Sequence, residues 1–141
     1  MPETLFYAKA MRGTSRLVGH WLLIGQSSPE RLAMILADTA RVAKLGEPKD
    51  TPSGATVEAW SGDVQPPLWA ARAASFLLMQ MPTKPAPRDE TEACAWAYCW
   101  LRNRDFERFE DAQAALPEHL REALAQALPD AWADRTSQRL I

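Results

Sequence analysis

The sequence has little of what metal and redox sites need. It contains only two cysteines, Cys94 and Cys99, and two histidines, His20 and His119, which lie almost a hundred positions apart. Neither residue type recurs at the short spacing typical of zinc ligands. We therefore expect no bound metal and no cofactor. His20 follows an apolar stretch and precedes Trp21, so it is expected at the edge of the core.

Motifs for covalent or phosphate chemistry are also missing. The chain has no glycine-rich phosphate loop and no Gly-x-Ser-x-Gly nucleophile motif. Acidic residues such as Glu107 and Glu110 are interleaved with Arg104 and Arg108 at a spacing that favours salt bridges along a helix. The sequence therefore indicates a protein that is not an enzyme.

No apolar run is long enough for a membrane-spanning helix. The longest, residues 68–81, is interrupted by Arg72 and falls short of the ~20 residues that a bilayer requires. The apolar run over residues 17–24 follows basic residues as in a signal peptide, but it contains a histidine and a glycine and precedes a poor cleavage site. The two cysteines lie five residues apart in a predicted helix, on different sides of it, which favours free thiols. We expect a cytoplasmic protein.

Tryptophan is abundant, and it marks the predicted core. The chain has six tryptophans, and Trp96 and Trp100 lie in the uncharged run of residues 93–101. A helix that is apolar on all sides is buried on all sides. The run follows acidic residues and precedes arginines, and Asp89 with Glu92 three residues later is typical of a capping box. The sequence predicts a central Trp-rich helix over residues 89–102.

The rest of the chain predicts further helices around this one. Ser28 and Pro29 open a helix over 29–45, which Gly46 is placed to close. Helices are also expected over residues 67–81 and from Pro117 to Pro129, and a short terminal helix with Trp132 follows them. A break after the central helix is expected between residues 102 and 105. Residues 55–60 fit a short helix or a strand equally well.

The first 25 residues allow two interpretations. Either Gly13 and Gly25 end two short helices, which we favour, or residues 4–24 form a β-hairpin. Taken together, the patterns predict one domain over residues 1–141. It is a mainly α, compact bundle of about five to seven helices around the central helix.

Charge is distributed unevenly along the chain. Residues 1–49 carry seven basic and four acidic side chains, and residues 89–141 carry six basic and eleven acidic ones. Such opposed segments are either solvated faces or a docking surface for a partner. Arginines also cluster at the predicted break, at positions 102, 104 and 108. Such a cluster is expected either to bind a phosphate or a partner's carboxylates, or to pair with the local acids Asp105 and Glu107.

These features favour a protein–protein interaction module, such as an adaptor, a small subunit, a chaperone-like protein or an inhibitor or immunity-type protein. Its partner is another protein or a second copy of the chain. The alternative is a nucleic-acid-associated subunit that uses the basic N-terminal third and residues 102–108, although the net charge of −2 is unusual for that class. Trp132 and Trp60 are the tryptophans expected to be exposed. The candidate partner-binding residues are Arg12, Arg16, Arg102, Arg104, Arg108 and Trp132.

Overall fold

The computed structural model describes residues 5–139 of the chain and is built of helices. In chain order, the helices of this part are α1 (Leu5–Ile24), α2 (Pro29–Val42), α3 (Gly54–Trp60), α4 (Leu68–Met79), α5 (Glu90–Asn103), α6 (Phe109–Ala115), α7 (Glu118–Arg121) and α8 (Ala127–Arg139). No strand occurs in the described range. The predicted mainly α fold is confirmed.

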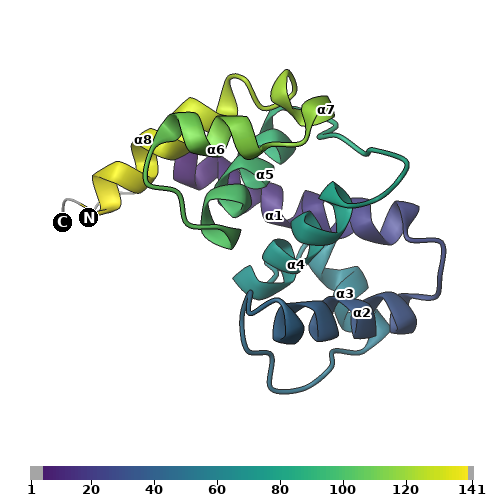
Figure 1. Ribbon diagram of the computed structural model, residues 1–141. Helices are drawn as coiled ribbons and strands as arrows, with labels where there is room; N and C mark the ends of the chain where they lie inside the picture. Colours follow the sequence, from purple (N-terminus) through teal and green to yellow (C-terminus); the bar gives the residue numbers. More distant parts are fainter. Residues whose placement is uncertain (1–4, 140–141) are drawn as a thin grey trace.

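The long helix α1 runs between two groups of helices (Figure 1). One group contains α5, α6, α7 and α8, and the other contains α2, α3 and α4. α1 packs against α5 and α8 on one side and against α3 and α4 on the other, while α4 also reaches α5. The core therefore extends from one group to the other, with Leu17, Val18 and Trp96 fully buried at its centre.

Residues 5–24 form one continuous helix rather than the predicted pair of short helices or the hairpin. Gly13 does not end a helix; it lies where α1 crosses α5. A Cβ atom on Gly13 would come within 2.2 Å of the Thr91 carbonyl oxygen and 2.8 Å of the Ala95 Cβ. The glycine is present because the two backbones approach too closely for any side chain.

Helix α5 forms as the sequence predicts. The Asp89 carboxylate caps it by accepting a 2.8 Å hydrogen bond from the backbone N–H of Glu92. Trp96 is fully buried and Trp100 nearly so. The helix ends at Asn103, and Arg104 adopts an extended conformation, which confirms the predicted break.

Serine side chains cap the N-termini of both α2 and α3. Ser28 and Ser53 each accept a hydrogen bond from the backbone N–H three residues on, so residues 55–60 belong to a helix. α2 ends at Val42, earlier than predicted, and the left-handed residue after it is Lys44 (φ 59°) rather than Gly46. Gly46 instead lies against Trp69, where a Cβ atom would come within 2.4 Å of the Trp69 Cβ.

The C-terminal helices differ from the prediction at Pro129. The helix that follows Pro117 ends at Arg121, and Pro129 lies in the first turn of α8 instead of ending a helix. Backbone N–H groups in a first turn have no intrahelical acceptor, so a proline costs no hydrogen bond there. The predicted row of leucines still packs into the core, with Leu120 in α7, Leu128 in α8 and Leu124 in the turn between the two helices.

Candidate binding groove

The basic face of α1 pairs with the acidic start of α5. The Lys9 Nζ lies 2.8 Å from a Glu90 carboxylate oxygen, and Arg16 forms an ion pair with Asp89. Part of the charge asymmetry seen in the sequence is therefore neutralised within the fold. These pairs hold α1 and α5 together on one side of a surface groove.

A buried carboxylate lies beneath these surface pairs. Glu92 has no exposed surface, and it accepts three hydrogen bonds. One of its oxygens lies 2.7 Å from Nδ1 of His20 and accepts a 2.9 Å hydrogen bond from the Trp96 indole, while the other accepts a 2.9 Å hydrogen bond from Nε of Arg88. A buried carboxylate is tolerated only when it is paired in this way.

The predicted capping box of Asp89 and Glu92 is therefore only half correct. Asp89 caps the helix, but the side chain of Glu92 turns into the core instead of reaching back to the Asp89 backbone. His20, expected at the core edge, is almost fully buried. Sequence reasoning missed the network, although Glu92 and Trp96 are four residues apart in α5, which places them on one helix face. Arg88 precedes the N-cap, so helical spacing does not reveal its contact with Glu92.

Arg88 connects the buried network to the surface. Its Nε donates to Glu92 and its Nη2 donates to the backbone carbonyl of Arg16 at 3.2 Å, yet 44% of its side chain is exposed. A guanidinium has five N–H donors, so Arg88 retains donors that face solvent. The two fixed hydrogen bonds hold the guanidinium in place before any ligand arrives.

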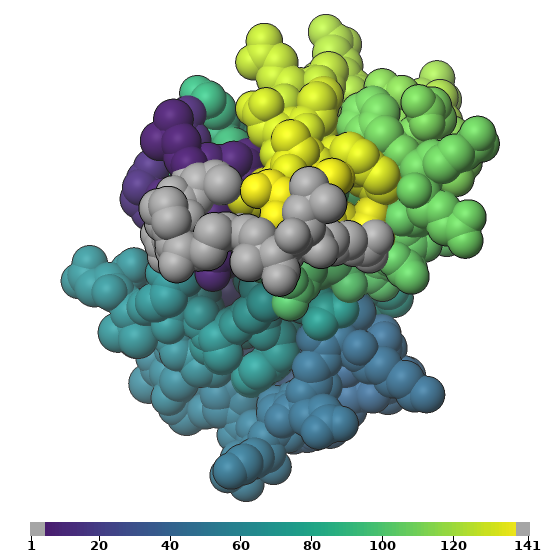
Figure 2. Space-filling view, turned by 90° about the vertical axis from the view of Figure 1, so that its left-hand side faces the viewer, coloured from purple at the N-terminus to yellow at the C-terminus, as the bar shows by residue number. Residues whose placement is uncertain are grey.

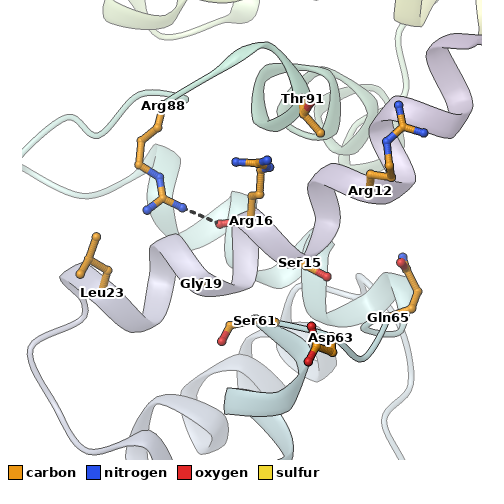
Figure 3. Close-up of a pocket in the computed structure, with 11 residues that line it drawn as sticks. Arg12, Ser15, Arg16, Gly19, Leu23, Ser61, Asp63, Gln65, Arg88 and Thr91 are labelled. Atoms are coloured by element: carbon orange, nitrogen blue, oxygen red, sulfur yellow. Dashed lines mark hydrogen bonds between the residues drawn. The ribbon is translucent and has the colours of Figure 1, made fainter.

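Arg88 lines a groove of about 740 Å³ that follows the outer face of α1 (Figure 3). The residues that line it are Arg12, Ser15, Arg16, Gly19, Leu23, Ser61, Gly62, Asp63, Gln65, Arg88 and Thr91. Ser15 and Gly19 lie along the middle of the groove, and Leu23 and Arg12 lie toward its two ends. The volume is within the range of ligand sites in proteins.

The two walls come from different helix groups. Arg88 and Thr91 lie on the α5 side of α1, and Ser61 and Asp63 lie on the α3 side (Figure 3). The α3 side is fixed to α1 by Gln65, whose amide donates to the Met11 carbonyl at 3.0 Å and to the Thr14 hydroxyl at 2.8 Å. The groove is therefore a feature of how the two groups pack on α1.

The predicted site residues fall into two separate sets. Arg12 and Arg16 line the groove. Arg102 and Arg104 lie at the other end of α5, about 20 Å away along a helix that rises ~1.5 Å per residue. The structure therefore brings the two N-terminal candidates together with Arg88, which sequence reasoning had not singled out, and leaves the others apart.

The arginines at the C-terminal end of α5 stack on aromatic rings. The guanidinium of Arg102 lies 5.6 Å from the centre of the Tyr98 ring, and that of Arg104 lies 5.4 Å from the Trp100 ring. The expected pairing with Asp105 and Glu107 is not what the structure shows. Arg108 reaches Asp111 at 3.5 Å, and Asp105 accepts from Arg135 at 2.8 Å.

Trp132 and Trp60 are packed rather than fully exposed. Trp132 on α8 meets Phe109 of α6 edge to face at 6.0 Å, and Arg135 covers its ring at 4.7 Å. Figure 2 shows α6 and α8 side by side on this part of the surface. Trp60 meets Trp69 in the same way at 5.7 Å. Both tryptophans are half-buried, so the expectation of an exposed pair is wrong.

Arg72 finds no carboxylate partner in the described structure. Its Nε donates to the Asn103 side chain and its Nη2 to the Arg102 carbonyl, each at 2.9 Å. It thus satisfies carbonyl groups at the C-terminus of α5, where a positive charge is favourable. Burial and the neighbouring Arg102 charge lower the pKa of Arg72 below its usual value.

The cysteines are free thiols, as predicted. Burial raises the pKa of Cys99 to about 12, and burial also raises the pKa of Cys94. Neither thiol is therefore poised as a thiolate nucleophile.

Residues 5–139 contain no group of three or more potential metal-ligating side chains, and none of their helices combines the length and apolar character of a membrane span. Comparison of the chain with family models, curated proteins and solved structures gave no match.

Proposed function

We propose that this chain is a non-enzymatic protein-binding module that receives a segment of a partner protein in the groove along α1. The observation that carries the proposal is the placement of Arg88. A fully buried carboxylate and a backbone carbonyl fix this half-exposed guanidinium at the side of a 740 Å³ groove. Preorganised arginines in concave sites are typical of protein interfaces.

The pairing of the basic residues favours a protein over a nucleic acid as the partner. Lys9, Arg16 and Arg41 each have a carboxylate within 3.1 Å. Nucleic-acid binding depends on cations that are available to neutralise phosphates, and these three are already paired. A cytoplasmic location is part of the proposal and is supported by the two free, buried thiols, which suit a reducing compartment.

Photo-crosslinking from the groove tests the proposal. A photoreactive amino acid replaces Leu23, which is 68% exposed at one end of the groove, and in a matched control it replaces Val42, which is 83% exposed at the end of α2. In lysate of the native host, we expect one protein adduct from position 23 that survives nuclease and is absent from position 42.

Competition makes the test specific to the groove. Excess wild-type protein should suppress the adduct, whereas a Gly19→Trp variant, in which an indole fills the middle of the groove, should not. Identical adducts from both positions would contradict the proposal. Adducts that nuclease removes would favour the nucleic-acid alternative, and an adduct with a second copy of the chain would identify self-association as the function of the groove.

A further inference from the structure

We propose that the segment bound in the groove is extended and acidic, with two carboxylates two residues apart and an aliphatic side chain about three residues beyond the second one. This inference rests on the proposed function and specifies the chemistry of the partner. It follows from the spacing, the charge and the exposure of the side chains along α1.

The spacing comes from the helix. Arg12, Arg16 and Leu23 line the same groove on α1. At ~1.5 Å per residue, the first two lie about 6 Å apart along the helix axis, and Leu23 lies about 10.5 Å beyond Arg16. An extended chain advances ~3.3 Å per residue. Those intervals therefore correspond to about two and about three residues of an extended ligand.

The charge that faces the groove is positive on the α1 and α5 side. Arg12 is exposed and makes no ion pair with any residue that the structure describes. Arg88 is 44% exposed, whereas its partner Glu92 is completely buried. The positive member of this pair thus faces the solvent and the negative member does not. One incoming carboxylate can use the guanidinium of Arg12. Arg16 is paired with Asp89, but the guanidinium of Arg88 is held at the Arg16 backbone carbonyl and keeps N–H donors that face solvent, so a second carboxylate can bind there.

The opposite wall carries the reverse charge. Asp63 is exposed on the α3 side, across α1 from Arg88 (Figure 3). It repels carboxylates from that wall and directs them toward the arginines, which fixes how the ligand lies across the groove. At the far end, Leu23 exposes 68% of its surface. An aliphatic side chain of the ligand would cover it and gain the hydrophobic contribution of that contact.

Synthetic peptides test this inference on the intact chain. The probe is the acetylated, amidated peptide Glu-Ala-Glu-Ala-Ala-Leu, together with its reversed sequence because the direction of binding is open. The controls replace both Glu with Lys or place the two Glu side by side. Binding is followed by the shifts of backbone amide resonances, which resolve Kd values up to about 1 mM, equivalent to ~4 kcal/mol.

We expect one direction of the probe to shift the amides of Ser15, Gly19 and Gly62 but not those of α2. Arg12→Glu should weaken binding at least tenfold, and Leu23→Asp should weaken it severalfold. Arg41→Glu, an exposed charge reversal on α2, should leave it unchanged. Affinity should fall as salt is added, because ion pairs near the surface are screened.

Three results would overturn the inference: no shifts with either direction, equal binding of the Lys peptide, or an affinity unchanged by Arg12→Glu. A single-stranded oligonucleotide that binds in place of the peptide and depends on Arg12 would also overturn it, in favour of a phosphate ligand. If neither peptide binds while position 23 still crosslinks one protein, only the acidic chemistry of the ligand is wrong. If neither peptide binds and position 23 gives no adduct, the proposed function is wrong as well.

Discussion

The two glycines of α1 should respond to alanine in opposite directions. At Gly13, an added Cβ would lie 2.2 Å from the Thr91 carbonyl oxygen, which is backbone and has no room to move. Alanine favours a helix over glycine by ~1 kcal/mol, but forcing a methyl group into a closed contact typically costs 1–3 kcal/mol or more. Because α1 and α5 would have to separate, we expect Gly13→Ala to destabilise the fold by about 2 kcal/mol.

Gly19 lies on the same helix, but its surroundings are different. An added Cβ would meet the Ser61 Cβ at 3.5 Å, which is an ordinary contact. Gly19→Ala should therefore stabilise the fold by roughly 0.5–1 kcal/mol through helix propensity alone. It provides the matched control, because the chemical change and the helix are the same.

Urea unfolding followed by far-UV circular dichroism measures both variants under one set of conditions. The midpoint should fall for Gly13→Ala and rise for Gly19→Ala, with the slope of the transition unchanged. If Gly13→Ala is as stable as the wild type, the close crossing of α1 and α5 is wrong, and with it the alignment that brings Arg16 to Asp89. If Gly19→Ala is strongly destabilised, the α3 side lies closer to α1 than described.

Three further variants, one of them with a matched control, test the site and its surroundings. Glu92→Leu should lower the free energy of unfolding by about 3–5 kcal/mol, because it leaves buried donors without an acceptor. Its control is Glu90→Leu, which removes a carboxylate whose side chain is 74% exposed. The control should lower the free energy of unfolding by less than ~1 kcal/mol in the same urea assay. The pKa of Cys99 is about 12 in the folded protein and 9.0 for the free thiol, so the unfolded chain loses this proton first as the pH rises. The free energy of unfolding therefore falls above about pH 9. Cys99→Ala should remove roughly 1.4 kcal/mol of that loss between about pH 8 and about pH 10. Arg104→Ala should cost at most ~1 kcal/mol, since it removes an exposed stacking contact, and should leave the position 23 crosslink intact; loss of that crosslink would place the binding site at the other end of α5.

The sequence predicted elements well wherever the signal is local. Ser28 and Asp89 cap the helices they were expected to cap, and the break expected between residues 102 and 105 correctly located the end of α5. The helix ends predicted at Gly13 and Pro129 were wrong for different reasons, a tertiary contact at Gly13 and a position in the first turn of α8 at Pro129. Gly13 looked like a helix end, but its lack of a side chain serves the crossing with α5. Pro129 looked like another end, but it occupies a first turn that tolerates it.

The groove was out of reach of the sequence for a related reason. Arg12 and Arg16 were candidates because they are basic, yet their position in a groove depends on the turn after α3, which Gln65 fixes to α1 across more than fifty residues. Arg88 was not a candidate, because its place beside Arg16 depends on how α5 lies against α1. Pairings of this kind leave no periodicity in the sequence.

The strongest reason to seek function at this groove is the cost of Glu92. Apolar residues in place of the whole network, Glu92 together with its buried donors His20 and Trp96, would serve packing without the desolvation of a carboxylate. Such a replacement of a complete buried ionic network is often neutral or stabilising, unlike the removal of Glu92 alone. The network therefore does something that packing does not require. Its visible structural effect at the surface is to fix Arg88, since Glu92 and the Arg16 carbonyl together hold a guanidinium that would otherwise move freely in solvent. A fixed cation in a groove binds carboxylates with a smaller entropic cost than a mobile one. Arg102 and Arg104, which stack on aromatic rings at the C-terminal end of α5, have no comparable support from a buried carboxylate in the described structure. The groove, and not the Arg102–Arg108 cluster, is therefore the place to test first.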